Sequence, residues 1–134
     1  MATDSIKALR NAVFNLLQAD ATLLTYVNGV YEYRGETVAF PYVYIEVMQA
    51  KEWSKLVTKG AEIEFTVQVV TQDKDSGKYG DILGRVQTLL HHSNPTVTGF
   101  TLQYIRWLET NFSEASGPNT FEGSSRFVAH LIES

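Results

Sequence analysis

The sequence predicts an α+β fold, a two-layer sandwich in which helices cover one face of a mostly antiparallel sheet, in the order α(α)ββαββ. Three observations lead to it. Two segments carry apolar residues at helical spacing, four segments alternate apolar and polar residues, and the alternating segments follow one another in pairs. The length of 134 residues suits a single domain over residues 1–134.

The N-terminal quarter predicts two helices. Asp4 or Ser5 can cap the first helix. Its apolar residues fall on one helical face: Ile6, Leu9, Val13, Leu16 and Leu17. A short second helix is expected from Asp20 and is ended by Asn28-Gly29. Residues 30–32 are a candidate short strand.

From Tyr42 onward the period changes to two, which predicts two long strands. The apolar positions alternate in both: Val43, Ile45 and Val47, then Ile63, Phe65, Val67 and Val69. Tyr42 and Tyr44 fall on the opposite face of the first strand, and Glu62 and Glu64 share the polar face of the second. We expect an antiparallel hairpin whose long polar tip is "KEWSKLVTKG", residues 51–60.

A second strong helix and two further strands follow. The helix has one apolar stripe: Ile82, Leu83, Val86, Leu89 and Leu90. The strands alternate Phe100, Leu102 and Tyr104, then Phe127, Ala129 and Leu131. Ile105 and Trp107 fall opposite Tyr104 and Leu108. Tyr, Trp and Met side chains on the second face of a sheet indicate either a covering layer or a protein partner.

The stretch "DKDSGKYGD", residues 73–81, resembles a ligand loop. A calcium loop starting at Asp73 needs a glutamate at its twelfth position, where this chain has Gly84, and Lys78 would place a cation inside the loop. A phosphate-binding loop fails on the spacing of its glycines and lysine. We therefore expect a turn in which Asp75 or Ser76 caps the next helix and Asp81 favours the positive end of the helix dipole.

No set of residues assembles a catalytic site. The chain has no cysteine, which removes disulfides and thiolate chemistry. His91 and His92 are adjacent on a helix, so their side chains diverge, and they suit the dipole at the helix end better than a shared metal. His130 is expected to point outward from a strand, with no carboxylate nearby in the sequence. We expect no enzyme activity, no metal and no cofactor.

Net charge and hydropathy exclude two further classes. The formal net charge of −4 is unlike that of a dedicated nucleic-acid binder. The N-terminus lacks the apolar region of a signal peptide, and no window approaches the ~20 apolar residues of a membrane span. We expect a soluble protein, made in the cytoplasm, that does not contact a membrane.

Several stretches together resemble one family, the tail completion or head–tail joining (tail terminator) proteins of long-tailed bacteriophages and gene transfer agents. The N-terminal "ALRNAVFNLLQADATLLTYVNGVYE" is similar to the family's opening helix, its A-D-x-x-L step and its glycine before a short strand. "FPYVYIEV" resembles the entry into its first long strand, and residues 51–92 resemble its central run of a Trp-Ser loop, a strand, a turn and a helix ending in Leu-His. The closing strands fit more loosely.

The resemblance implies a structural protein of the virion's head–tail junction. Members of the family form a ring, expected to be hexameric, at the head-proximal end of the tail tube. The ring ends tube polymerisation and docks to the head connector, while genome DNA passes through the lumen without specific binding. The implied partners are further copies of the chain, the tube protein and the connector or neck protein.

We expect the residues that matter to be contact residues in and beside the hairpin tip: Lys51, Trp53, Lys55, Leu56, Val57, Lys59, Glu62 and Glu64. Apolar side chains on a charged loop are a plausible docking element for the tube or a neighbouring subunit. Two alternatives stay open. One is another neck or head-completion subunit, and the other is a small metal-dependent enzyme that uses Asp73, Asp75 and Asp81.

Overall fold

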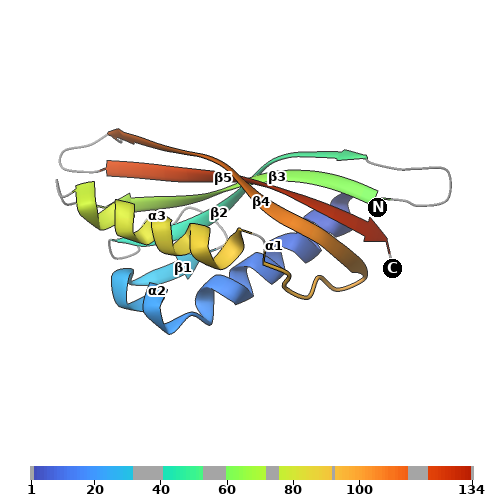
Figure 1. Ribbon diagram of the computed structural model, residues 1–134, viewed down its shortest axis with the longest axis horizontal. Helices are drawn as coiled ribbons and strands as arrows, with labels where there is room; N and C mark the ends of the chain where they lie inside the picture. The colour runs from blue at the N-terminus through green and yellow to red at the C-terminus, as the bar shows by residue number, and fades with distance from the viewer. Residues whose placement is uncertain are drawn as a thin grey trace.

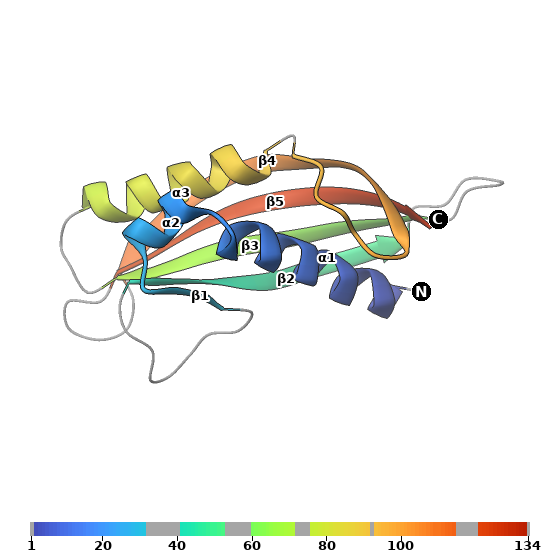
Figure 2. The same ribbon diagram turned by 90° about the horizontal axis from the view of Figure 1, so that it is seen from below.

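The computed structural model describes residues 2–31, 41–52, 60–71, 76–91, 93–114 and 121–133. Within them, three helices lie on one face of a five-stranded sheet (Figures 1 and 2). The elements in chain order are α1 (Ala2–Gln18), α2 (Ala21–Tyr26), β1 (Gly29–Tyr31), β2 (Tyr42–Glu52), β3 (Gly60–Thr71), α3 (Ser76–Leu90), β4 (Phe100–Glu114) and β5 (Phe121–Glu133). The predicted α+β sandwich is confirmed.

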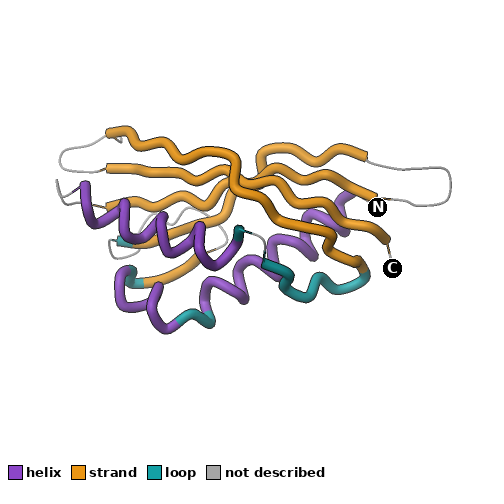
Figure 3. The backbone as a smooth tube through the Cα atoms, viewed as in Figure 1, coloured by secondary structure: helices purple, strands orange, loops and turns teal. Residues whose placement is uncertain are grey.

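The sheet has the strand order β1-β2-β3-β5-β4, and all its pairs but one are antiparallel. The exception is β1, which pairs in parallel with β2 from Gly29↔Tyr42 to Tyr31↔Tyr44 and adds a strand to the predicted order. Strands β2 and β3 form one hairpin, and β4 and β5 form the other. The two hairpins pair through β3 and β5, so β5 lies between β3 and β4 in the sheet. The long strands twist strongly across one another (Figure 3).

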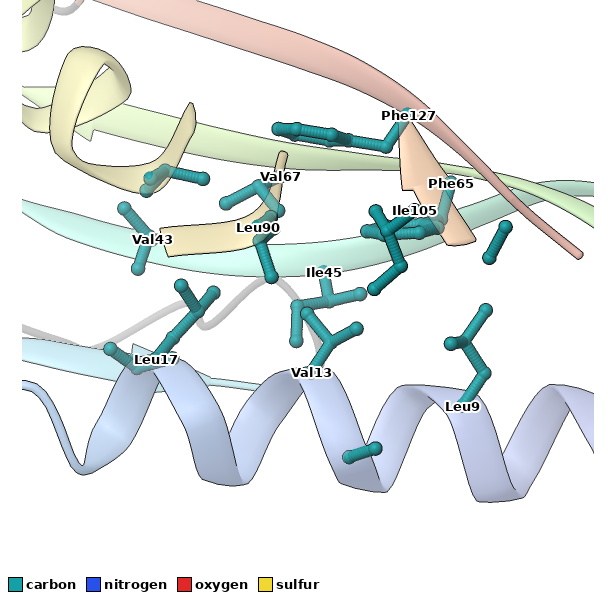
Figure 4. Close-up of a cluster of buried hydrophobic side chains, with 14 of the residues drawn as sticks. Leu9, Val13, Leu17, Val43, Ile45, Phe65, Val67, Leu90, Ile105 and Phe127 are labelled. Atoms are coloured by element: carbon teal, nitrogen blue, oxygen red, sulfur yellow. The ribbon is translucent and has the colours of Figure 1, made fainter. Parts of the chain in front are cut away.

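The hydrophobic core lies between the sheet and the helices. Leu9, Val13 and Leu17 recur on one face of α1 and point at the sheet, as their spacing predicted (Figure 4). They meet buried side chains of the strands and of α3: Val43, Ile45, Phe65, Val67, Leu90, Ile105 and Phe127. The rings of Phe65 and Phe127 stack with centroids 5.5 Å apart. The residues that alternate in the strands and those that repeat at helical spacing therefore belong to the same hydrophobic core, as the sequence predicted.

The start of α1 differs from the prediction. The helix begins at Ala2, so Asp4 and Ser5 lie inside it rather than at its cap, and Ser5 is fully buried. Residues Thr3 to Ser5 all have side chains that can cap a helix. The type of side chain alone therefore did not show at which residue the helix begins.

The predicted start of α2 at Asp20 is confirmed, and Asp20 is the N-cap of this helix and also connects it to α3. The carboxylate of Asp20 accepts a hydrogen bond from the backbone N–H of Leu23 at 2.8 Å. The same carboxylate accepts two bonds from Arg85 of α3, from Nε at 2.9 Å and from Nη2 at 2.8 Å. This bidentate hydrogen bonding to Arg85 is the main reason why the pKa of Asp20 is lowered.

Candidate protein-interaction surface

The face of the sheet turned away from the helices is an ordered array of side chains, which we call the open face. The pairing of β2, β3, β5 and β4 aligns these side chains in rows across the four strands. The Lys51 row contains Lys51, Glu62, His130 and Tyr104. The Gln49 row contains Gln49, Glu64, Val128 and Arg106. Charged groups from four strands, distant in sequence, therefore share one surface.

The open face is hollowed where the two rows meet. The hollow has a volume of about 200 Å³ and is lined by Gln49, Lys51, Glu62, Glu64, Arg106, Leu108 and Val128. Three of the eight predicted contact residues, Lys51, Glu62 and Glu64, lie in this lining. The other five, Trp53, Lys55, Leu56, Val57 and Lys59, fall outside the described residues, between the end of β2 and the start of β3.

The Lys51 row is held together by contacts between strands. Nε2 of His130 lies 2.9 Å from Oε1 of Glu62, and the ring of Tyr104 stacks on His130 with centroids 4.5 Å apart. The guanidinium of Arg106 lies 5.2 Å from the centroid of Tyr104, within reach of a cation–π interaction. The outward direction predicted for His130 is confirmed. Its carboxylate partner was missed because Glu62 is 68 positions away in the chain.

A second charged group crosses the sheet beside the hollow. Nε of Arg126 lies 3.5 Å from Glu64, and its Nη1 lies 3.3 Å from Glu109. These side chains are partly exposed, so each pair contributes at most about 1 kcal/mol to the free energy of unfolding. Their main consequence is that Arg126 holds the carboxylate of Glu64 in place at the edge of the hollow.

At the opposite end of the open face the side chains are buried, so they are not accessible to a partner. Tyr42 and Tyr44 stand on this face as predicted, yet they are only 2% and 5% exposed. They form a small cluster with Val70 and Tyr31, and the hydroxyl of Tyr44 donates to Oε1 of Gln68 at 3.0 Å. Trp107 belongs to the other face, where it packs against the main core. The candidate surface is therefore restricted to the end near Lys51.

The calcium interpretation of residues 73–81 is excluded by the backbone. A twelve-residue loop from Asp73 would extend to Gly84, whereas α3 already begins at Ser76. Asp81 is exposed on this helix, and Asp73 and Asp75 fall outside the described residues. Among the described residues no group of three or more His, Asp or Glu side chains could hold a metal ion.

His91, directly after α3, forms a hydrogen bond to the edge strand β4. Its Nδ1 accepts a hydrogen bond from the backbone N–H of Trp107 at 3.0 Å. Trp107 lies on β4, an edge strand, and an outward-facing N–H on such a strand is a site where another strand could pair. His92, the second histidine of the predicted pair, lies outside the described residues.

In the described part of the chain, no helix combines the length and the hydropathy needed to cross a membrane.

Comparisons with known proteins give one family and one fold. Residues 11–131 match the family model of "Tail completion protein gp17". A chain in the solved "Virion of native gene transfer agent (GTA) particle" is similar, with a TM-score of 0.88 and 21% identity over 96% of this chain and 97% of that one. A second solved structure, without a descriptive name, is similar with a TM-score of 0.60 and 13% identity, over 100% and 97% of the two chains. No curated protein matches the chain.

Proposed function

The chain belongs to the family of tail completion protein gp17, a family of phage tail structural proteins, and we propose that it forms a ring at the head-proximal end of the tail tube. The ring, of six copies, ends tube polymerisation and joins the tail to the head. The family match over residues 11–131 is the observation that carries this proposal. The similar chain in a gene transfer agent virion supports a place in a virion. Within the virion, the position that we propose is the head–tail junction.

The geometry of the open face supports an assembly role. A closed ring requires two different surfaces on each subunit that are complementary to each other. In this chain the two outer surfaces are built from different elements, one from the helices that cover the core and the other from strands that expose rows of charged side chains. Such a subunit can join its neighbour front to back and present a further surface to the tube or the connector.

We assign the predicted contact set to this role. Lys51, Glu62 and Glu64 line the hollow at the end of the β2–β3 hairpin, and Trp53, Lys55, Leu56, Val57 and Lys59 belong by sequence to the segment that joins those strands. The chain acts as one domain over residues 1–134. Its net charge of −4 is compatible with a lumen through which DNA slides without specific binding.

Two measurements test the proposal. Light scattering of the purified protein should show a species of six times the 15.0 kDa of one chain. Tubes assembled without the protein should grow to variable lengths, and adding it should fix their length and place a cap at one end in negative-stain images. A protein that binds purified heads but leaves free tubes uncapped would instead be another neck subunit. A monomer that binds neither would overturn the proposal.

A further inference from the structure

The hydrogen bond between His91 and β4 fixes the protonation state of the imidazole. A backbone N–H can only donate, so Nδ1 of His91 is the acceptor of the 3.0 Å bond from Trp107. A neutral imidazole accepts at one ring nitrogen and donates at the other, whereas an imidazolium carries a hydrogen on both. His91 can therefore form this bond only as the neutral tautomer that has its hydrogen on Nε2.

The end of α3 holds this ring beside the strand by contacts of its own. The backbone N–H of His91 donates to the carbonyl of Gln87 at 2.8 Å, which continues the helical bonding by one residue. The carbonyl of Leu90 accepts from the backbone N–H and from the hydroxyl of Ser93, at 3.0 and 2.8 Å. The position of His91 next to β4 therefore does not depend on the bond to Trp107.

The N–H that His91 accepts belongs to an edge of the sheet. In the described part of the chain β4 pairs with β5 alone, so its other side has no neighbouring strand. Leu108, the residue after Trp107, is the extra residue of a bulge in this pairing. A backbone N–H that loses its acceptor at such an edge is open to water or to another strand.

We propose that His91 makes the edge of the sheet at Trp107 sensitive to acid. The neutral ring occupies the N–H and keeps this part of β4 closed. When Nδ1 takes up a proton, two donors face each other, the bond is lost and the N–H of Trp107 is released. Imidazole is the side-chain group whose charge ordinarily changes between about pH 5 and 8, so the release falls in that range. The ring-forming role proposed above is not needed for this behaviour.

The charged groups of the elements packed against α3 lie on two sides of the sheet. On the open face, turned away from α3, are the described charged groups of β3, β4 and β5: Glu62, Glu64, Arg106, Glu109, Glu122, Arg126 and His130. In the helix layer are Lys7, Arg10, Asp20, Tyr26, Asp81 and Arg85, of which Asp20 and Arg85 bind each other. Residues 93–99 contain no titratable side chain. His92 lies outside the described residues, so the test must separate three imidazoles.

Amide exchange of the intact ¹⁵N-labelled protein, followed by NMR, tests the proposal. The protection factor of the Trp107 amide, which corrects for the intrinsic effect of pH on exchange, is measured from about pH 8 to about pH 5. We expect it to fall in acid by roughly two- to tenfold, the range for one hydrogen bond. The amide of Phe127, on the central strand β5, should keep its protection. Ring ¹⁵N spectra at the upper end of the range should show Nδ1 of His91 without a hydrogen.

Substitutions at the histidines assign the effect. His91→Asn puts an amide oxygen on Cγ in place of Nδ1, an acceptor that does not titrate, so the Trp107 protection factor should stay constant with pH. His91→Ala removes the acceptor, and protection should be low throughout. His92→Gln and His130→Gln should both keep the pH dependence of the wild type.

Five results would each overturn the proposal. They are a Trp107 protection factor that is constant in the wild type, a hydrogen on Nδ1 of His91 at the upper end of the range, a pH dependence that persists in His91→Asn, one that disappears in His92→Gln or His130→Gln, and a loss of protection that extends to Phe127. Tube capping is measured in a separate assay, so the proposed function stands or falls on its own result.

Discussion

The carboxylate of Asp20 joins a helix cap and an ion pair, and three substitutions separate the two. It accepts the Leu23 N–H at 2.8 Å and both donors of Arg85 at 2.8 and 2.9 Å. Arg85→Gln removes the ion pair and keeps the cap. Asp20→Ser also keeps a capping oxygen, since serine caps helices about as well as aspartate, whereas Asp20→Ala removes both contacts.

The expected magnitude comes from the cap. Replacing a good N-cap by alanine costs about 1 kcal/mol, so Asp20→Ala should have a free energy of unfolding about 1 kcal/mol below that of Asp20→Ser. In a chain of this length that difference lowers Tm by about 4 °C. The ion pair lies at the surface, and its removal in Arg85→Gln should cost less than the loss of the cap. Urea titration of the four proteins measures both effects.

The ion pair should also give a defined pH dependence. Hydrogen bonding to Arg85 is the largest effect and lowers the pKa of Asp20, burial opposes it, and the Leu23 bond lowers it further. Because the folded pKa lies below the unfolded value of about 3.9, the stabilisation is complete above that pH and is lost as the pH falls through the folded pKa. The stability difference between wild type and Arg85→Gln should be constant from pH 7 to 5 and shrink below 4. A difference that grows at low pH, or an Asp20→Ser protein no more stable than Asp20→Ala, would refute the reasoning.

Three further predictions concern the core, the hairpin segment and metal binding. Phe127→Ala should lower the free energy of unfolding by about 3–5 kcal/mol because its ring is fully buried, and the half-exposed Phe112→Ala should cost about 1 kcal/mol or less in the same urea titration. Trp53→Ala should fold normally yet impair attachment to tubes, and infectious particles at wild-type yield from this mutant would argue against a docking role. Calcium or magnesium at millimolar concentration should leave Tm unchanged, whereas a concentration-dependent rise would support a metal site.

The helices and strands that the sequence predicted are those whose apolar residues repeat at a regular spacing. Alternation over Ile63 to Val69 and the stripe of Ile82 to Leu90 each follow from one face meeting a continuous core, which is a local signal. Residues 30–32 were predicted as a candidate short strand, and β1 is observed at Gly29–Tyr31, but its parallel pairing with β2 was not predicted. That pairing depends on how the segments meet in space, and three residues are too few to encode a partner.

The same distinction explains how far the candidate surface was predictable. Alternation put Glu62 and Glu64 on one face and His130 outward, because each of these follows from a strand's own period. The contacts that join them required the order of strands, since Arg126 reaches Glu64 only because β5 lies beside β3. Arg106 had no signal in the sequence, because an arginine on a strand is commonly an ordinary solvent-exposed residue.

One irregularity of β4 connects the protection of the sheet edge with the hollow. The pairing of β4 with β5 shifts between Trp107 and Glu109, so Leu108 is an extra residue in a bulge. A bulge disfavours the addition of another strand at an edge, and the hydrogen bond from Trp107 to His91 occupies an N–H at the same place. The same bulge puts Leu108 into the hollow, next to Val128. We therefore expect partners to bind this part of the subunit through side chains on the open face, and not by extending its sheet along β4.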